Sequence, residues 1–187
     1  MVYCNMAPEI VLPAEWEPVD DYSSHRPMLY LALEKVPRGT VCEIGCGIGS
    51  TVLLHDYCTR RLRRCFGFET SFSWWERFKD FAIFWPMKYT ELYYKAPYIK
   101  PDILFIDSAP GEERSDLIKQ WSKDSHVIIL HDTEPGAEYV YGMSEVLNTF
   151  KYRVDLHIPG SPSTTAVSNY IDLNEWRGIT IGNYQIT

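Results

Sequence analysis

The sequence predicts an α/β protein built on a mostly parallel sheet. Three observations carry this prediction: short continuous apolar runs, helical segments between those runs, and a glycine-rich turn directly after the first run. Continuous apolar strands that alternate with helices are typical of a parallel sheet covered on both faces. The turn contains Gly45, Gly47 and Gly49, and glycines at alternate positions let the backbone bend tightly and approach a ligand closely.

The first half of the chain supplies alternating helices and strands. In order, we expect a helix over residues 28–33 with Pro27 in its first turn, a strand over 41–44, a helix over 51–57, a strand over 65–69, a helix over 73–84 and a third strand over 89–94. The segment 74–98 is rich in Trp and Tyr, which are more often core residues, although exposed aromatic faces can also stack on sugar rings.

The second half continues this alternation and then changes character. In order, we expect a strand over residues 103–106, a polar helix over 113–123, an apolar strand over 126–130 and two final strands over 152–158 and 164–173. A Pro-Gly-Ser-Pro turn joins the last two strands, so they should form a hairpin at the edge of the sheet.

Length and composition indicate one globular domain. We expect residues 1–187 to form a single domain, in which the proline-containing residues 1–21 are an irregular N-terminal arm. The formal net charge of −7 argues against a nucleic-acid partner, and the basic run from Arg60 to Arg64 is typical of a solvated helix end. No apolar run approaches the ~20 residues of a membrane span, so the expected protein is cytoplasmic and has no membrane partner.

The five cysteines do not form a recognisable metal or disulfide pattern. They are Cys4, Cys42, Cys46, Cys58 and Cys65, with no CxxC pair among them and no histidine spacing that suits zinc. A reducing compartment fits this set best.

Acidic residues close four of the predicted strands. They are Glu43, Glu69, Asp107 and, after His131, Asp132. Ligands of open α/β sheets bind outside the carboxyl ends of the strands, and buried acids are costly unless something pairs with them. The sequence therefore predicts a ligand site at this end of the sheet.

Glu69 follows Gly49 by 20 residues, at the end of the second predicted strand. A carboxylate in this place can accept hydrogen bonds from both hydroxyls of a ribose, so we expect an adenosine-containing cofactor. The alternative is that Glu69 only caps the helix that follows it. Ser50 stands where a dinucleotide-binding turn would have its third glycine, and Glu43 would repel a pyrophosphate but attract an α-ammonium group. These two residues favour S-adenosylmethionine over NAD.

The motif Glu43-Ile44-Gly45-Cys46-Gly47-Ile48-Gly49, followed by Glu69 and Asp107, resembles the ordered motifs of class I S-adenosylmethionine-dependent methyltransferases. This resemblance covers roughly residues 25–172 and implies a Rossmann-like three-layer fold, whose seven-stranded sheet has its last strand antiparallel. The segments 105–111, with Arg114, and 129–133 resemble sugar and natural-product O-methyltransferases, many of which use a divalent metal. Ser108 departs from the commoner Asp-Gly pattern of those enzymes.

The strand-end residues also suit methyl transfer to oxygen. A sugar hydroxyl attacks only after its proton is removed or a metal polarises it. Asp107 and Asp132 could supply oxygen ligands to Mg²⁺ or Mn²⁺, with His131 as the base. A metal-free version, in which Asp107 or His131 alone takes the proton, fits equally well. As alternatives without a catalytic role, Asp132 could cap a helix and His131 could bond to the backbone.

The expected function is therefore methyl transfer from S-adenosylmethionine to a hydroxyl, on a small-molecule or glycan acceptor whose methylated group is a sugar. The predicted catalytic residues are Asp107, His131 and Asp132, and the predicted metal ligands are Asp107 and Asp132. The predicted cofactor-binding residues are Glu43, Gly45, Cys46, Gly47, Gly49, Ser50, Glu69, Thr70 and His25, with Tyr22 beside His25 as a further pocket residue. An NAD-dependent oxidoreductase and a non-catalytic partner protein that binds the cofactor are the alternatives.

Overall fold

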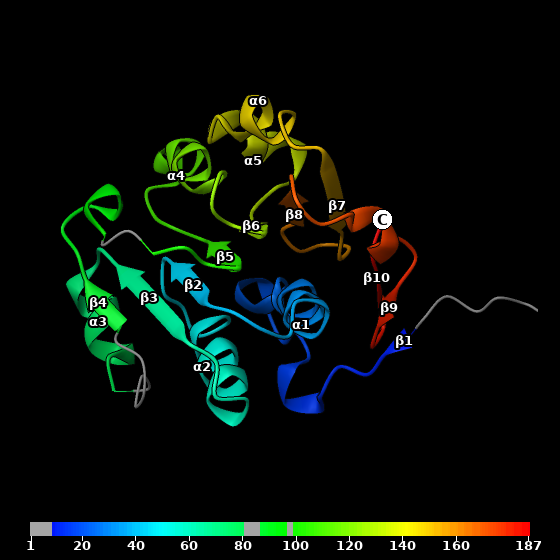
Figure 1. Cartoon of the computed structure of the whole chain (residues 1–187), viewed down its shortest axis with the longest axis horizontal. Coiled ribbons are helices and arrows are strands. Elements are labelled where there is room, and N and C mark those ends of the chain that lie inside the picture. The colour runs from blue at the N-terminus through cyan, green and yellow to red at the C-terminus, as the bar shows by residue number, and fades with distance from the viewer. Residues whose placement is uncertain (1–8, 81–86, 97–98) are drawn as a thin grey trace, which may run out of the picture.

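The computed structural model describes residues 9–80, 87–96 and 99–187. Seven strands form one sheet in the order β4-β3-β2-β5-β6-β8-β7 (Figure 1). Their bounds are Val41–Ile44 for β2, Cys65–Glu69 for β3, Met87–Tyr89 for β4, Ile103–Ile106 for β5, Val127–His131 for β6, Tyr152–Leu156 for β7 and Thr164–Ser168 for β8. Strands β2 to β6 run parallel, whereas β8 is antiparallel to both β6 and β7. The expected sheet, with its last strand antiparallel and a hairpin at its edge, is confirmed.

Helices cover both faces of this sheet, as Figure 1 shows. One layer contains α1 (Arg26–Lys35), α2 (Thr51–Arg60) and α3 (Phe72–Phe78), and the other contains α4 (Arg114–Trp121), α5 (Pro135–Val140) and α6 (Met143–Leu147). The predicted three-layer Rossmann-like architecture is therefore confirmed.

Alternate residues of each central strand enter different cores. Phe105 and Ile129 pack with α1 and α2 on one face, whereas Leu104 and Ile128 pack with α4 and α6 on the other. Both faces of the sheet are therefore buried from solvent, which is why these strands are continuous apolar runs in the sequence.

The N-terminal segment is more regular than the predicted arm. Glu9–Ile10 forms β1, which pairs in parallel with β9 (Thr180–Ile181), and β10 (Tyr184–Gln185) completes a small second sheet. Two 3-10 turns, η1 (Ala14–Trp16) and η2 (Asp21–Ser23), follow β1. Leu12 and Trp16 are buried in the core, so this segment packs against the domain instead of extending from it. Residues 1–8, which include Cys4, lie outside the described residues.

Three predicted elements have different bounds in the structure. The third strand of the sheet is Met87–Tyr89, so only Tyr89 of the range predicted as strand is in it, and a 3-10 turn, η3 (Tyr93–Lys95), begins at the end of that range. Helix α3 ends at Phe78, and the last residues of the predicted helix 73–84 lie outside the described ranges. Strand β8 ends at Ser168 because the hydroxyl of that residue accepts hydrogen bonds from two backbone N–H groups just beyond it, which turns the chain toward η5 (Leu173–Trp176).

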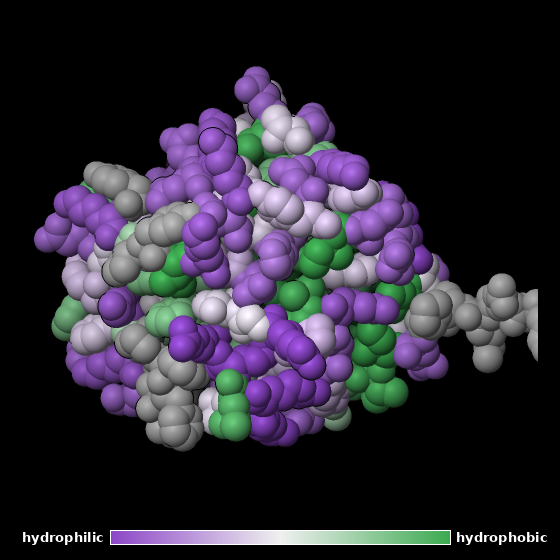
Figure 2. All heavy atoms as spheres, in the orientation of Figure 1, coloured by the Kyte–Doolittle hydropathy of each residue, from purple (hydrophilic) through white to green (hydrophobic). Residues whose placement is uncertain are grey.

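The face of the molecule in Figure 2 is mostly hydrophilic, with separate apolar patches. Over the residues that the structure describes, no helix has the length and apolar character that crossing a bilayer requires. The basic run lies at a helix end as predicted, because α2 ends at Arg60. Arg60 pairs with Asp56, and Arg61 pairs with Glu34.

Candidate functional site

The glycine-rich turn lies at the carboxyl end of β2, between β3 and β5, where the strand order of the sheet reverses. Gly45 has φ +86°, and a Cβ atom there would lie 2.3 Å from the carbonyl oxygen of Asp107. Glycine therefore lets the ends of β2 and β5 approach closely. A Cβ atom at Gly47 would meet only the hydroxyl of Ser50, at 3.8 Å. The space above Gly47 is consequently open to a ligand.

Gly49 gives room to the N-terminal segment instead. A Cβ atom there would lie 1.9 Å from the carbonyl oxygen of Tyr22 and 2.9 Å from Cε1 of His25. Residues 22–25 therefore lie directly across the turn, as expected for His25 and Tyr22. The side chain of Tyr22 is exposed, whereas His25 is buried.

Glu43 stabilises the glycine-rich turn through the hydroxyl of Thr51, a residue that was not selected from the sequence. The backbone N–H of Gly47 donates to Oγ1 of Thr51 at 2.9 Å, and that hydroxyl donates to Oε2 of Glu43 at 2.9 Å. Burial raises the pKa of Glu43 to about 8. The other oxygen, Oε1, has no hydrogen-bond partner among the described residues, so it is available to a polar group of a ligand.

Glu69 lies beside the same turn, at the end of β3. Its Oε2 accepts a hydrogen bond from the backbone N–H of Cys46 at 2.8 Å, and its Oε1 accepts one from Ser71 at 2.6 Å. The hydroxyl of Tyr93, a residue not selected from the sequence, lies 3.4 Å from Oε1. Oε2 therefore keeps a lone pair for a ribose hydroxyl. The cap of α3 is Ser71, not Glu69, and the half-buried Thr70 lies between them.

Arg114 connects the ends of β5 and β6. The buried guanidinium donates to Oδ1 of Asp107 at 2.9 Å and to Oδ2 of Asp132 at 3.0 Å. It also donates to the carbonyl oxygens of Ser108 and His131, both at 2.9 Å. Burial by itself would raise the pKa of Asp107, but the hydrogen bond and charge of His131 and the charge of Arg114 outweigh it, so the pKa lies well below its usual range.

The predicted metal ligands Asp107 and Asp132 are both paired with Arg114. The guanidinium bonds to one oxygen of each carboxylate, which leaves the second oxygen of each for an ion. The cap alternative for Asp132 is wrong, since the N-cap of α5 is Glu134. Asp132 instead has φ +55°, a strained conformation that Asp tolerates better than most residues and that is common at functional sites.

His131 is the last residue of β6, and both of its ring nitrogens have polar neighbours that orient the ring. Its Nε2 lies 2.9 Å from Oγ of Ser24, another residue not selected from the sequence. Its Nδ1 lies 3.4 Å from Oδ2 of Asp107 and 3.4 Å from Oδ1 of Asp132. The alternative of a ring bonded to the backbone is therefore wrong. Burial favours a lower pKa for His131, but the hydrogen bond and charge of Asp107, together with the charge of Asp132, raise it overall.

His25 completes the cluster. Its ring lies 4.7 Å from the ring of His131 and 4.8 Å from the ring of Phe105, measured between centroids. Within the described part of the chain, neither ring nitrogen has a hydrogen-bond partner. Burial, with the positive charge of His131 as a second cause, lowers the pKa of His25 to about 3, so the ring is neutral at pH 7.

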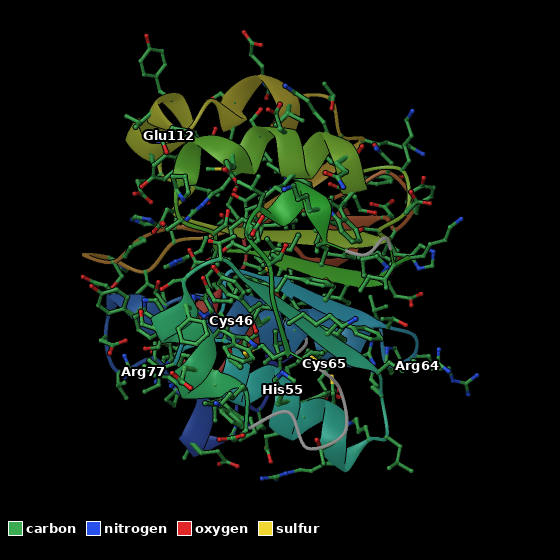
Figure 3. The ribbon with its side chains drawn as sticks, turned by 90° about the vertical axis from the view of Figure 1, so that its left-hand side faces the viewer. Cys46, His55, Arg64, Cys65, Arg77 and Glu112 are labelled. Atoms are coloured by element: carbon green, nitrogen blue, oxygen red, sulfur yellow. The ribbon has the colours of Figure 1, made fainter. Side chains whose placement is uncertain are left out.

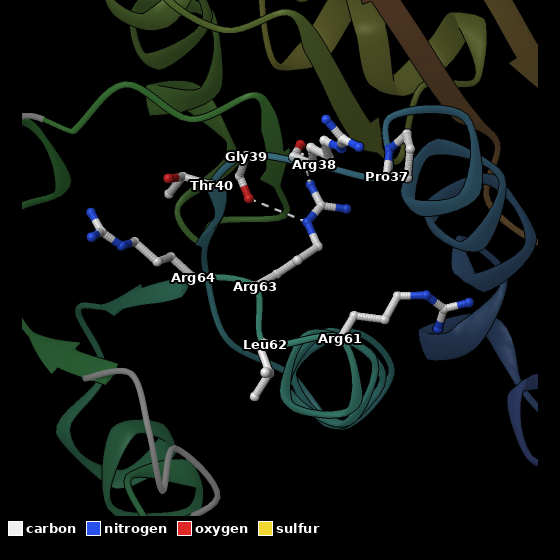
Figure 4. Close-up of a pocket in the computed structure, with 8 residues that line it drawn as sticks. All are labelled: Pro37, Arg38, Gly39, Thr40, Arg61, Leu62, Arg63 and Arg64. Atoms are coloured by element: carbon white, nitrogen blue, oxygen red, sulfur yellow. Dashed lines mark hydrogen bonds between the residues drawn. The ribbon is translucent and has the colours of Figure 1, made fainter.

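A second notable region lies away from these residues. A hollow of about 370 Å³ is lined by Pro37, Arg38, Gly39, Thr40 and Arg61 to Arg64, at the amino ends of β2 and β3 (Figure 4). Figure 3 shows Cys46 of the turn and Arg64 toward opposite ends of the strands. The basic run and the candidate site are thus separate.

The comparisons with known proteins show the fold. No family profile and no curated protein matches the chain. Among solved structures, the O-methyltransferase TomG from Streptomyces achromogenes, involved in tomaymycin synthesis and bound to S-adenosylmethionine, aligns with 79% of this chain and 87% of its own at 15% identity and a TM-score of 0.57. An O-methyltransferase from Bacillus cereus, bound to S-adenosylhomocysteine, aligns over 84% of both chains at 16% identity and a TM-score of 0.56.

A third similar structure is named for a protein acceptor. The ribosomal protein L11 methylase from Lactobacillus delbrueckii subsp. bulgaricus aligns with 89% of this chain and 97% of its own at 17% identity and a TM-score of 0.58. The chain therefore has the fold of S-adenosylmethionine-dependent methyltransferases. Because one fold can serve different acceptors, the fold alone does not select one.

Proposed function

We propose that the chain, as a single domain, transfers a methyl group from S-adenosylmethionine to a hydroxyl of a sugar in a glycan or glycosylated metabolite. The observation that carries this proposal is the juxtaposition of two sets of residues. The turn with Glu43 and Glu69 lies at the end of β2 and β3, and the cluster of Asp107, His131 and Asp132 lies at the adjacent ends of β5 and β6.

Residues of the turn suit the cofactor. The open space above Gly47 admits the ligand, Oε2 of Glu69 can accept from a ribose hydroxyl, and the unpartnered Oε1 of Glu43 can form a hydrogen bond with a polar group of the cofactor. Gly45, Cys46, Gly49 and Ser50 shape the same turn, and Thr70 follows Glu69. When bound, S-adenosylmethionine supplies an electrophilic methyl group for the attacking oxygen.

The strand-end cluster supplies the proton acceptor. A hydroxyl becomes a sufficient nucleophile when a base removes its proton as it attacks. The imidazole of His131 is a stronger base than an ordinary histidine, because the charges of Asp107 and Asp132 stabilise its protonated form. Arg114 in turn holds both carboxylates in place.

Exposed aromatic rings favour a sugar acceptor. Phe72, Trp74 and Tyr89 are exposed, and the rings of Phe72 and Tyr89 meet edge to face at 5.7 Å. Such surfaces can stack on the apolar face of a sugar ring. Trp85 and Tyr98 of the same aromatic segment lie outside the described residues.

Binding of S-adenosylhomocysteine, measured by isothermal titration calorimetry, is the first test. We expect Glu69→Gln to weaken the affinity by about tenfold to a hundredfold, because a hydrogen bond to a charged group is lost. Asp102→Asn is the matched control, since Asp102 also accepts a hydrogen bond from a backbone N–H, that of Thr40, but at the opposite end of the sheet. Equal affinities of the two variants would refute the ribose assignment.

Transfer of a labelled methyl group to a panel of glycosylated acceptors then tests the reaction itself. Labelled sugar hydroxyls are the expected result. Binding of the cofactor without transfer to any acceptor would favour the non-catalytic partner protein, and quenching of NADH fluorescence in place of S-adenosylhomocysteine binding would favour the oxidoreductase.

A further inference from the structure

We propose that His25, Asp107 and His131 together bind a divalent transition-metal ion. One potential ligand atom of each residue lies within 4.8 Å of those of the other two. This site differs from the two-carboxylate site predicted from the sequence, because it excludes Asp132 and includes two ring nitrogens.

Three separate elements bring the ligands together. His25 precedes the first turn of α1, Asp107 directly follows β5, and His131 ends β6. Metal–ligand bonds of about 2.1 Å place neighbouring ligands about 3–3.5 Å apart, so the cluster needs to contract by about 1 Å to enclose an ion. The long separation of 3.4 Å between Nδ1 of His131 and Oδ2 of Asp107 already lies in this range.

Ser24 orients His131 for coordination. The hydroxyl of Ser24 lies within hydrogen-bond distance of two carbonyl oxygens, those of Asp21 at 3.0 Å and Pro162 at 3.2 Å. Carbonyl oxygens only accept, so the single hydroxyl proton is directed toward them and Nε2–H of His131 donates to Oγ. In the neutral ring, the lone pair of Nδ1 then faces two carboxylates. A cation at that position removes the repulsion.

His25 is the second indication of a ligand. Its ring is 1% exposed, and neither nitrogen has a hydrogen-bond partner within the described residues. A buried polar group without a partner is costly, and such groups are uncommon in folded proteins. Coordination to an ion would satisfy one of these nitrogens.

The charges and the donor types indicate which ion suits the site. The two carboxylates and the guanidinium of Arg114, which lie beside the two rings, together carry a net negative charge. Imidazole nitrogens favour zinc, cobalt and related ions over magnesium, which prefers an all-oxygen shell. The ion would also tie the segment 22–25 to the strand ends across the turn.

The metal site shares residues with the proposed function but does not depend on methyl transfer. An ion and a proton cannot both be bound at Nδ1 of His131. Protein treated with a chelator should therefore keep an imidazole that can take the proton of the acceptor hydroxyl. Binding of the ion can be measured separately, without a cofactor or an acceptor.

The test is titration of chelator-treated protein with Co²⁺, followed by its visible absorption bands, with Zn²⁺ and Mg²⁺ compared by calorimetry. We expect one Co²⁺ per chain, and weaker binding of Mg²⁺ than of Zn²⁺. His25→Phe keeps the ring contacts with Phe105 and His131 but removes both nitrogens, and His25→Gln keeps polarity. Both should lower the Co²⁺ affinity by about a hundredfold or more, because a direct ligand is lost.

Asp132→Asn is the matched control, because Asn tolerates the left-handed backbone of this position and the change removes the charge, and with it the ion pair to Arg114, of a carboxylate outside the proposed ligand set. It should cost at most about tenfold in affinity. Circular dichroism and urea denaturation establish that each variant is folded. The proposal would be overturned if adding Co²⁺ to the wild-type protein produced no new visible absorption bands. It would also be overturned if Asp132→Asn lost more Co²⁺ affinity than the two His25 variants.

Discussion

The two ends of the central sheet each contain a buried arginine, but the partners of these arginines differ. At the carboxyl end, Arg114 donates to the carboxylates of Asp107 and Asp132. At the amino end, the hydrogen-bond partners of Arg63 among the described residues are backbone carbonyl oxygens, at Gly39, Arg38 and Leu33 (Figure 4).

This difference distinguishes the candidate site from a structural arginine. Arg63 satisfies carbonyl groups at and beyond the end of α1, where a positive charge is favourable, and these partners among the described residues are uncharged. Arg114 allows two acids and a histidine to lie together at the strand ends. A charged group that only stabilises the fold needs no such set of acids around it.

Replacement of Arg114 should have the largest effect on stability. Arg114→Met leaves two carboxylates near one another without their counter-ion, and breaking a largely buried ion pair costs about 3–5 kcal/mol. Because the two Asp side chains are 27% and 24% exposed, we expect a loss of about 3 kcal/mol in the free energy of unfolding, near the lower limit of that range. Urea denaturation measures this loss. A loss in the free energy of unfolding smaller than that of Arg63→Met would contradict the proposed difference between the two ends of the sheet.

The sequence predicted the carboxyl end of the sheet better than its edges. The central strands were located because burial on both faces makes them continuous apolar runs, and the glycine turn and Glu69 were located because both have a characteristic spacing. The two-residue strand Glu9–Ile10 has no pattern of its own, since its partner is Thr180–Ile181 at the other end of the chain. Only the folded chain brings these segments together.

Within the site, the sequence identified the acids but not the residues that support them. The role of Thr51 depends on the side of α2 that faces Glu43, and the role of Ser24 depends on a contact with His131 across 107 residues. Arg114 was noted as part of the motif with residues 105–111, and its bonds to both Asp107 and Asp132 follow from the alignment of β5 with β6. Such contacts depend on tertiary packing, which has no local signal.

The pH dependence of stability should show a second effect at the carboxyl end. Unlike Asp107, Glu43 has no cation bonded to it in the described structure, and its pKa is raised from 4.5 to about 8. Between these two pH values the folded chain holds a proton that the unfolded chain has released, so the stabilising contribution falls as the pH rises through that window. Glu43→Gln removes this titration while keeping the shape of the side chain.

We therefore expect the stability of the wild-type protein to fall relative to Glu43→Gln as the pH rises from 4.5 to 8, and to change little relative to it below that window. Urea denaturation of both proteins at several pH values gives the difference. A constant difference across the window would show that Glu43 is ionised in the folded protein at neutral pH.

Replacement of Arg63 should have the smallest effect of the three. Arg63→Met removes hydrogen bonds to the carbonyl oxygens of Gly39, Arg38 and Leu33, but it leaves neutral groups behind, and water can reach them through the hollow beside Gly39. We expect a loss of about 1–2 kcal/mol in the free energy of unfolding. Binding of S-adenosylhomocysteine should not change, because the arginine lies at the far end of the strands from the glycine turn. A loss of cofactor affinity in Arg63→Met, at a temperature where the variant is folded, would show that the two ends of the sheet are coupled.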